Sequence, residues 1–194
     1  MTLKLIQTEP TEEPVLLPAL KSHLVVEHEL DNVRIAALGK AARQWVEART
    51  NRVLVRQKWR QYWDFFQVFK LEPASVKEID QIQYTDSTGA TITWATTEYT
   101  FDEPRQEVYL AFGMVHPVTR SVRNAVWLDV WSGYYNNAVS PLDVRDGVPE
   151  DIKTVIKMLV EDLYNNPGKH SEIQLYNNAT FDAMLQPFVV YANG

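Results

Sequence analysis

The sequence predicts an α+β protein with a helical bundle core, made of two long helices plus short N- and C-terminal helices, and a small antiparallel β region inserted in it. Two long stretches repeat apolar residues at steps of three and four, the period of an amphipathic helix. Between them, over residues 53–132, the period changes to two and β-branched and aromatic residues become frequent, as in strands. We expect one domain over residues 1–194, with residues 187–194 as a C-terminal tail.

The composition agrees with a folded domain and excludes several other classes of protein. Of 194 residues, 45% are hydrophobic and 23% are charged, and 19 basic against 25 acidic residues give a net charge of −6. This apolar content excludes a disordered chain. No stretch approaches the roughly 18 uncharged apolar residues of a membrane span, and the start of the chain lacks the pattern of a secretory signal. The absence of cysteine excludes disulfides and thiol chemistry.

The first two helices follow from capping signals and apolar spacing. Pro18 suits the first turn of a short helix that we expect to end near Leu24. Asp31 suits the N-cap of a long helix from about Asn32 to Thr50. The apolar side of this long helix consists of Ile35, Leu38, Ala42, Trp45 and Val46.

The β region follows from alternation and from turn residues. Apolar and polar residues begin to alternate at Val53. Residues 82–84 and 91–94 flank the turn cluster Thr85–Gly89, which predicts a hairpin. Two further strands are expected at residues 107–112 and 125–131.

The C-terminal part returns to the helical period. Val148-Pro149-Glu150-Asp151 opens the second long helix, because proline suits its first position and acidic residues suit its first turn. Asn165–Gly168 is expected to end this helix. A short last helix is predicted from Thr180 to Gln186. The apolar side of the second long helix consists of Ile152, Val155, Ile156, Leu159, Val160, Leu163 and Tyr164.

No motif predicts catalysis, a cofactor or a bound metal. Glycine-rich phosphate loops and the nucleophile-elbow motif are absent from the sequence. The one alternative from an enzyme class is a small metal-dependent hydrolase using His23, Glu27, His28 and Asp31. The two histidines are five residues apart, whereas four would align them on a helix face, so a solvated acidic connector is favoured.

Two further segments have open interpretations. The run Lys58–Trp63 interleaves basic and aromatic residues, a pattern that can bind single-stranded nucleic acid. A strand with its aromatic face in a core and Lys58 and Arg60 outside explains the same alternation and is favoured. The apolar end of the chain suggests docking on another chain or on its own domain. Its candidate interface residues are Leu185, Phe188, Val189, Val190 and Tyr191.

Several segments together resemble the head–tail connector proteins of tailed phages, also called adaptor or head-completion proteins, which occur in prophages and gene transfer agents. Residues 14–31 resemble the opening segment of that family. Residues 35–54 are similar to the end of the first long helix in that family. Gln57-Lys58-Trp59 resembles its first strand. Residues 148–166 and 181–188 are similar to its closing helices. Departures include Leu17 in place of a capping threonine and Asn51 in place of glycine.

The resemblance implies a structural virion protein without catalytic residues. Such proteins form a ring of typically twelve copies at the head–tail junction, dock on the portal protein and present a surface for a stopper or tail-completion protein. DNA passes through the ring without specific binding, and no membrane is involved. Assembly is expected in the cytoplasm of the bacterial host. The alternative within this class is a stopper or tail-completion ring, and the predicted portal contact is the C-terminal set from Leu185 to Tyr191.

Overall fold

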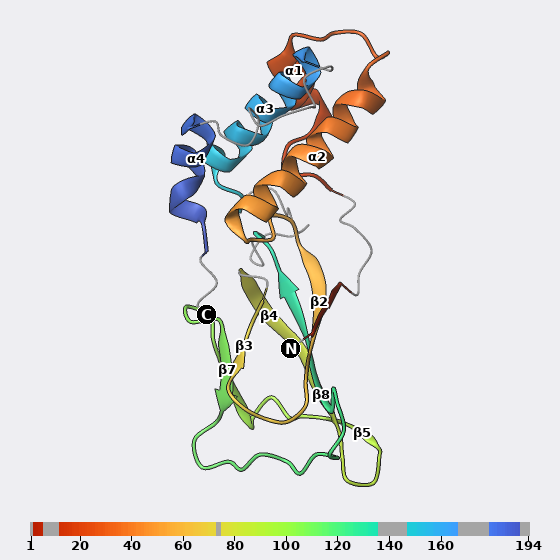
Figure 1. The fold of residues 1–194 in the computed structure, drawn as a ribbon, viewed down its shortest axis with the longest axis vertical. Coiled ribbons are helices and arrows are strands. Elements are labelled where there is room, and N and C mark those ends of the chain that lie inside the picture. Colours follow the sequence, from red (N-terminus) through yellow and green to blue (C-terminus); the bar gives the residue numbers. More distant parts are fainter. Residues whose placement is uncertain (1, 6–11, 73–74, 136–146, 167–178, 191–194) are drawn as a thin grey trace. The chain divides into compact units, whose positions relative to one another are not determined.

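The computed structural model describes residues 2–5, 12–72, 75–135, 147–166 and 179–190, and the chain divides into two compact units (Figure 1). The β unit comprises Met1–Pro10 and Arg56–Gly133. The helical unit comprises Thr11–Val55 and Tyr134–Gly194. Among the described residues, no helix combines the length and the hydropathy that a membrane span requires.

The β unit contains two antiparallel sheets within the described residues. The five-stranded sheet has the order β1 (Thr2–Leu5), β2 (Gln57–Trp63), β8 (Val126–Ser132), β4 (Val76–Thr85) and β5 (Thr91–Thr93). The three-stranded sheet has the order β3 (Phe69–Lys70), β7 (Glu107–Leu110) and β6 (Tyr99–Asp102). The predicted hairpin is present as β4 and β5, and the predicted last strand is the central strand β8.

Alternation along β8 decides which face of the five-stranded sheet is buried. Val126, Leu128 and Val130 are fully buried on one face, because successive side chains of a strand point to opposite sides. Trp63 of β2 and Tyr84 of β4 both pair with Val126 and join the same face. The remaining buried members of this core are Phe69, Leu71, Val76, Ile82, Trp94 and Val108.

The helical unit matches the predicted helices closely. Its elements are α1 (Leu17–Leu24), α2 (Asn32–Thr50), α3 (Glu150–Asn165), α4 (Ala179–Leu185) and the 3-10 turn η2 (Gln186–Phe188). Val25 and Asn51 end α1 and α2 in the left-handed conformation, with φ of 56° and 52°. Asparagine tolerates this conformation, so Asn51 can end α2.

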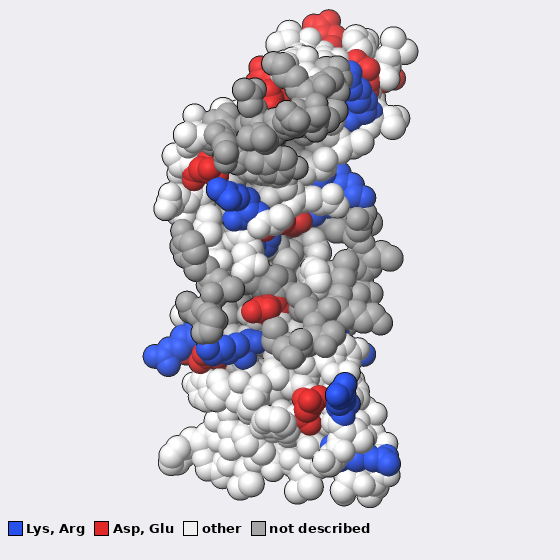
Figure 2. All heavy atoms as spheres, viewed as in Figure 1, with Lys and Arg blue, Asp and Glu red and all other residues white. Residues whose placement is uncertain are grey.

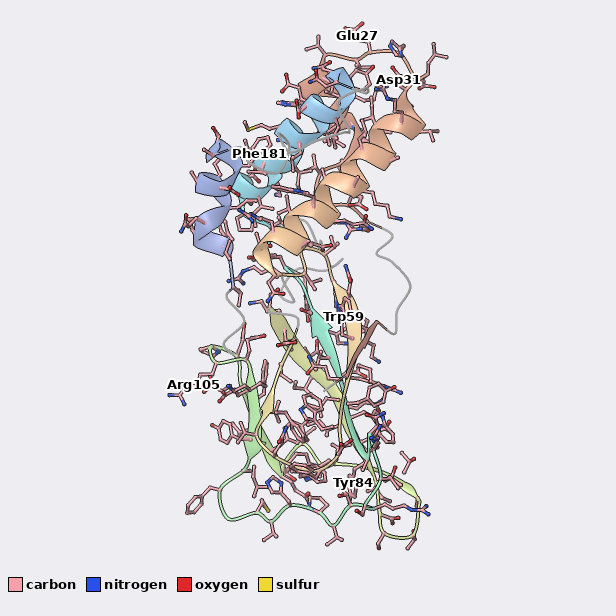
Figure 3. The ribbon with its side chains drawn as sticks, in the orientation of Figure 1. Glu27, Asp31, Trp59, Tyr84, Arg105 and Phe181 are labelled. Carbon is pink, nitrogen blue, oxygen red and sulfur yellow. The ribbon has the colours of Figure 1, made fainter. Side chains whose placement is uncertain are left out.

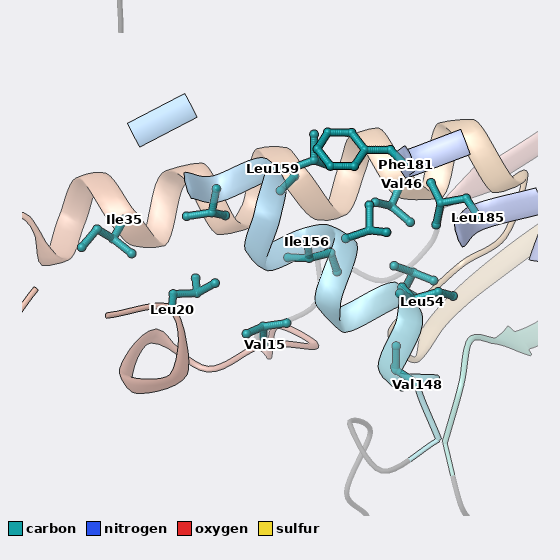
Figure 4. Packing of buried hydrophobic residues seen from close by; sticks show 14 residues of the cluster. Val15, Leu20, Ile35, Val46, Leu54, Val148, Ile156, Leu159, Phe181 and Leu185 are labelled. Atoms are coloured by element: carbon teal, nitrogen blue, oxygen red, sulfur yellow. The ribbon is translucent and has the colours of Figure 1, made fainter. Parts of the chain in front are cut away.

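One hydrophobic core joins the helices α1, α2, α3 and α4 (Figure 4). Ile35 and Val46 of α2, Ile156 of α3, and Phe181 and Leu185 of α4 all belong to this cluster, with Ile35 beside Leu20 at one end of it. The ring of Phe181 lies 6.3 Å from that of Trp45, in an edge-to-face geometry. Leu20, Val15, Leu54 and Val148 complete the cluster from α1 and from the segments beside α2 and α3.

The predicted fold class is wrong. The structure is not a helical bundle with a small inserted β region, because the β unit has two sheets and a hydrophobic core of its own. The strands β1 and β3 were not predicted because they are only four and two residues long, and they pair with β2 and β7. Near the expected start of the β region at Val53, Leu54 is buried in the helical core, and β2 begins at Gln57.

Candidate interaction surfaces

The C-terminal segment predicted to meet the portal is anchored on its own helical unit. Leu185 is fully buried in the helical core, and Phe188 packs partly against that core. Val189 and Val190 are half-buried. Tyr191 lies outside the described residues. Among the described members of the set, the partly exposed ones are Phe188, Val189 and Val190.

Hydrogen bonds to the end of α2 hold this segment in place. The Val190 N–H donates to the Thr50 carbonyl over 2.9 Å. The Arg52 guanidinium Nε donates to the Phe188 carbonyl over 2.6 Å. The Phe188–Val190 stretch is therefore a fixed surface of the helical unit, ready for a partner without a large ordering cost.

The residues of the hydrolase alternative lie around the connector between α1 and α2. The Nε2 of His23 is 3.0 Å from the Glu161 carboxylate. The Nε2 of His28 is 3.8 Å from Asp31 Oδ2, which also accepts the Tyr164 hydroxyl over 2.6 Å. Figure 3 shows Glu27 and Asp31 at this connector. Within the described part of the chain, no group of three or more His, Asp or Glu side chains could hold a metal ion.

A buried arginine that the sequence analysis missed joins three segments of the helical unit. Arg43 Nε donates to Glu13 over 2.7 Å, and its Nη1 donates to Glu47 over 2.6 Å. Glu47 also accepts the Leu54 N–H over 2.9 Å. Burial raises the pKa of Glu47 above its ordinary value, although Arg43 opposes this. Burial lowers the pKa of Arg43, but its two carboxylate partners outweigh that and raise it. This structural network involves the C-terminal half of α2.

The outer face of the five-stranded sheet carries paired charges. Arg60 donates from Nε and Nη2 to the buried Asp129 carboxylate over 2.6 and 2.8 Å. Lys58 Nζ is 2.7 Å from Asp80. The Arg56 guanidinium stacks 3.5 Å from the ring centroid of Trp131.

The structure decides the interpretation of the run Lys58–Trp63. Trp63 is buried and Trp59 packs against the β-unit core, whereas Lys58 and Arg60 lie on the opposite face. The favoured strand interpretation is therefore confirmed. Both cations are already paired with carboxylates, so neither Lys58 nor Arg60 is free to track a nucleic-acid backbone.

The loops at one end of the β unit form an exposed apolar surface, which we call the loop patch. It comprises residues 64–68 and 111–124, where Phe112 is fully exposed and Val115 and Val118 are 84% and 77% exposed. Phe65, Val68, Met114 and Val122 add further exposed apolar area. In Figure 2 few charged side chains are visible at the lower end of the β unit, where this loop runs in Figure 1. Beside it, Tyr62, Trp63, Asp64, Phe65, Gln67, Arg123 and Asn124 line an open hollow of about 490 Å³.

A second exposed apolar surface lies at the connector between α1 and α2, and we call it the connector patch. Leu30 is 91% exposed, and Val25 and Val33 are each 85% exposed. Glu27 and Glu29 lie between these residues in the sequence and are exposed as well. Sequence reasoning described this segment as a solvated acidic connector and missed its apolar side chains, because nothing local distinguishes an exposed valine from a core valine.

Three solved structures share this fold over the whole chain. They are the neck of an empty gene transfer agent (GTA) particle computed with C6 symmetry (TM-score 0.74, 18% identity), the neck of a native GTA particle computed with C12 symmetry (0.71, 17%) and the virion of a native GTA particle (0.73, 16%). Each alignment covers 100% of this chain and 98% of the other. No protein-family model and no curated protein matches the chain. The likeness establishes the fold and confirms the resemblance that the sequence segments indicated.

Proposed function

We propose that the chain is a structural virion protein of the neck, which forms a ring on the portal vertex and joins the DNA-filled head to a stopper or tail. The observation that carries this proposal is the shared fold over the full chain with neck chains of gene transfer agent particles. Those necks were computed with C6 and C12 symmetry, which supports a ring of repeated copies for this chain as well.

The charges of the chain support passage of DNA without specific binding. The net charge is −6, and the basic residues Lys58 and Arg60 on the outer sheet face are paired with carboxylates. A protein that grips DNA presents unpaired cations to the phosphates and releases counterions. Arg120 and Arg123 form no ion pair among the described residues, but they lie in the loop patch, which is assigned below to a contact with a neighbouring copy. The channel wall is accordingly proposed to repel the duplex weakly rather than hold it.

The portal contact is proposed at Phe188–Val190, the accessible part of the predicted C-terminal set. The test uses V189D/V190D, which puts two charges on this surface and leaves the Val190 N–H bond to Thr50 available. We expect at least a tenfold loss of binding to isolated portal rings, because charge buried in an apolar interface is costly. Ile92→Asp, at an exposed position of β5, serves as the matched control.

Two results would count against this proposal. Unchanged portal binding by a folded V189D/V190D variant would remove the C-terminal contact. Binding of the wild-type chain to tail tubes and not to portal rings would favour a tail-completion ring.

A further inference from the structure

We propose that neighbouring copies in the ring join by seating the loop patch of one copy on the connector patch of the next. The inference deepens the proposed function and rests on its ring. Among the described residues, these two patches hold every large apolar side chain that is more than half exposed. Scattered exposed apolar residues are ordinary, but clusters of this kind mark interaction sites.

The two patches carry opposite unpaired charges. Arg120 and Arg123 lie in the loop patch, and no acidic residue occurs between Glu107 and Asp129. Within the described residues, neither arginine forms an ion pair, and neither do Glu27 and Glu29 of the connector patch. Two free cations on one apolar surface and two free carboxylates on another are complementary.

The loop patch also contains Asp64, and Asp86 lies beside it, but neither carboxylate forms an ion pair with Arg120 or Arg123 among the described residues. Asp64 accepts the Asn124 N–H over 2.8 Å. Asp86 accepts the N–H groups of Thr88 and Ala90 and the hydroxyl of Thr88. One oxygen of each carboxylate thus accepts bonds that shape the loops. The guanidinium groups of Arg120 and Arg123 have no ion-pair partner within the described part of the chain.

The loop patch is built as a fixed surface. The Arg120 N–H donates to the Thr85 carbonyl and the Ala111 N–H donates to the Glu98 carbonyl, both over 2.9 Å. The His116 ring stacks on Phe66, with 5.6 Å between centroids. Residues on both sides of the exposed valines are therefore tied to the β unit, so docking orders little additional chain.

The occupant is a second copy of this chain because the ring requires contacts between unlike surfaces. In a cyclic ring each subunit presents one surface to the neighbour on one side and a different surface to the other neighbour. One chain that carries two apolar patches of opposite charge meets this requirement. A separate neck protein with an acidic apolar surface is the competing occupant of the loop patch, and the experiment below separates the two.

The test exchanges the charges of the patches. The loop variant is R120E/R123E, the connector variant is E27K/E29K, and the third protein combines all four substitutions. Native mass spectrometry and sedimentation measure assembly, and circular dichroism checks folding. We expect each two-residue variant alone to associate at least about 100-fold more weakly than wild type, since like charges then face each other. A mixture of the two variants, and the combined protein, should assemble again.

Several outcomes overturn the inference. Rings that persist in both two-residue variants would reject these contacts and leave the proposed ring function standing. Loss of assembly without recovery in the mixture or in the combined protein would reject the pairing and favour the separate neck protein as occupant. Portal binding, measured in parallel, tests the proposed function independently.

A cysteine cross-link decides the matter if the wild-type chain stays monomeric in solution. The natural chain has no cysteine, so V33C/V115C is the only thiol pair under oxidation. We expect trimers and longer ladders, which single V33C or V115C proteins cannot form because one thiol per chain stops at a dimer. Replacing V115C by I92C should abolish the ladder. Absence of a ladder from V33C/V115C would reject the inference.

Discussion

Replacing Arg43 by methionine tests the buried charge network that joins α2 to the segments on either side of it. The Arg43 side chain is 3% exposed, and its partners Glu13 and Glu47 are 28% and 17% exposed. In the R43M variant, Glu47 keeps only the Leu54 N–H as a partner among these contacts. Removing one member of a buried pair leaves an uncompensated charge, so we expect a loss of about 3–5 kcal/mol in the free energy of unfolding.

The pH dependence of R43M gives the sign of the effect. Burial raises the pKa of Glu47 even beside Arg43, and without Arg43 nothing cationic opposes burial in this network. A carboxyl whose pKa is higher in the folded state binds its proton more tightly there, so stability rises as the pH falls toward the unfolded pKa. The loss in the free energy of unfolding of R43M relative to wild type should therefore shrink as the pH is lowered from about 7.5 to about 5, where carboxyl groups begin to bind protons.

Urea unfolding followed by far-ultraviolet circular dichroism measures these free energies for the helical unit. The control is R43M/E47Q, which removes the stranded charge and should regain about 1–3 kcal/mol relative to R43M. The reasoning would be refuted by an R43M protein that loses less than about 1 kcal/mol, or by an R43M/E47Q protein no more stable than R43M.

Three further substitutions test the core packing of the helical unit and the buried polar groups of the β unit. Phe181→Ala should cost about 3–5 kcal/mol in urea unfolding, because Phe181 is buried against Trp45 in the helical core; a loss under about 1 kcal/mol would place α4 elsewhere. Asp129→Asn should cost about 1.5–3 kcal/mol near neutral pH. Burial raises the pKa of Asp129, but bonds from Arg60 and Gln81 lower it overall. The stability that Asp129 contributes is thus lost as the pH falls through its folded pKa, and the variant should lack that acid-dependent loss. Gln61→Met should stabilise the β unit by about 1–3 kcal/mol, since its buried amide has no hydrogen-bond partner among the described residues; an unchanged midpoint would mean that the amide is satisfied.

The helices of this protein are predictable because their signals are local. Pro149 and the two acidic residues after it mark the start of α3, and the apolar steps along it give its buried side. Asp31 and Asn51 likewise bracket α2 at the predicted residues, although the Asp31 carboxylate accepts the Tyr164 hydroxyl and makes no capping bond. Such signals act within a few residues along the chain, so no knowledge of tertiary contacts is needed to recognise them.

The β unit is less predictable because its strands depend on distant partners. β3 has two residues and exists through pairing with β7, which lies more than thirty residues away along the chain. Val53–Val55 alternates like a strand, yet Leu54 completes the helical core. Sequence periodicity alone cannot distinguish an extended segment that packs on helices from one that pairs in a sheet.

The interaction surfaces are the least predictable feature. Leu185 looked like part of an exposed apolar end, but it is buried by α2 and α3. Phe112 and Val115 continue the apolar pattern of the strand before them, and only the fold shows that they face solvent. Exposure is a property of the packed chain, so apolar residues of a core and of an interface carry the same local signal.

Reconstitution on heads tests the central claim most directly. Purified wild-type protein is added to DNA-filled heads that contain the portal but lack this gene product, and the portal vertex is imaged by electron cryomicroscopy. The account predicts a ring of copies on the portal, heads that become competent to accept tails, and loss of the ring with V189D/V190D. A bare portal vertex, with the protein bound to tails or to neither structure, would contradict it.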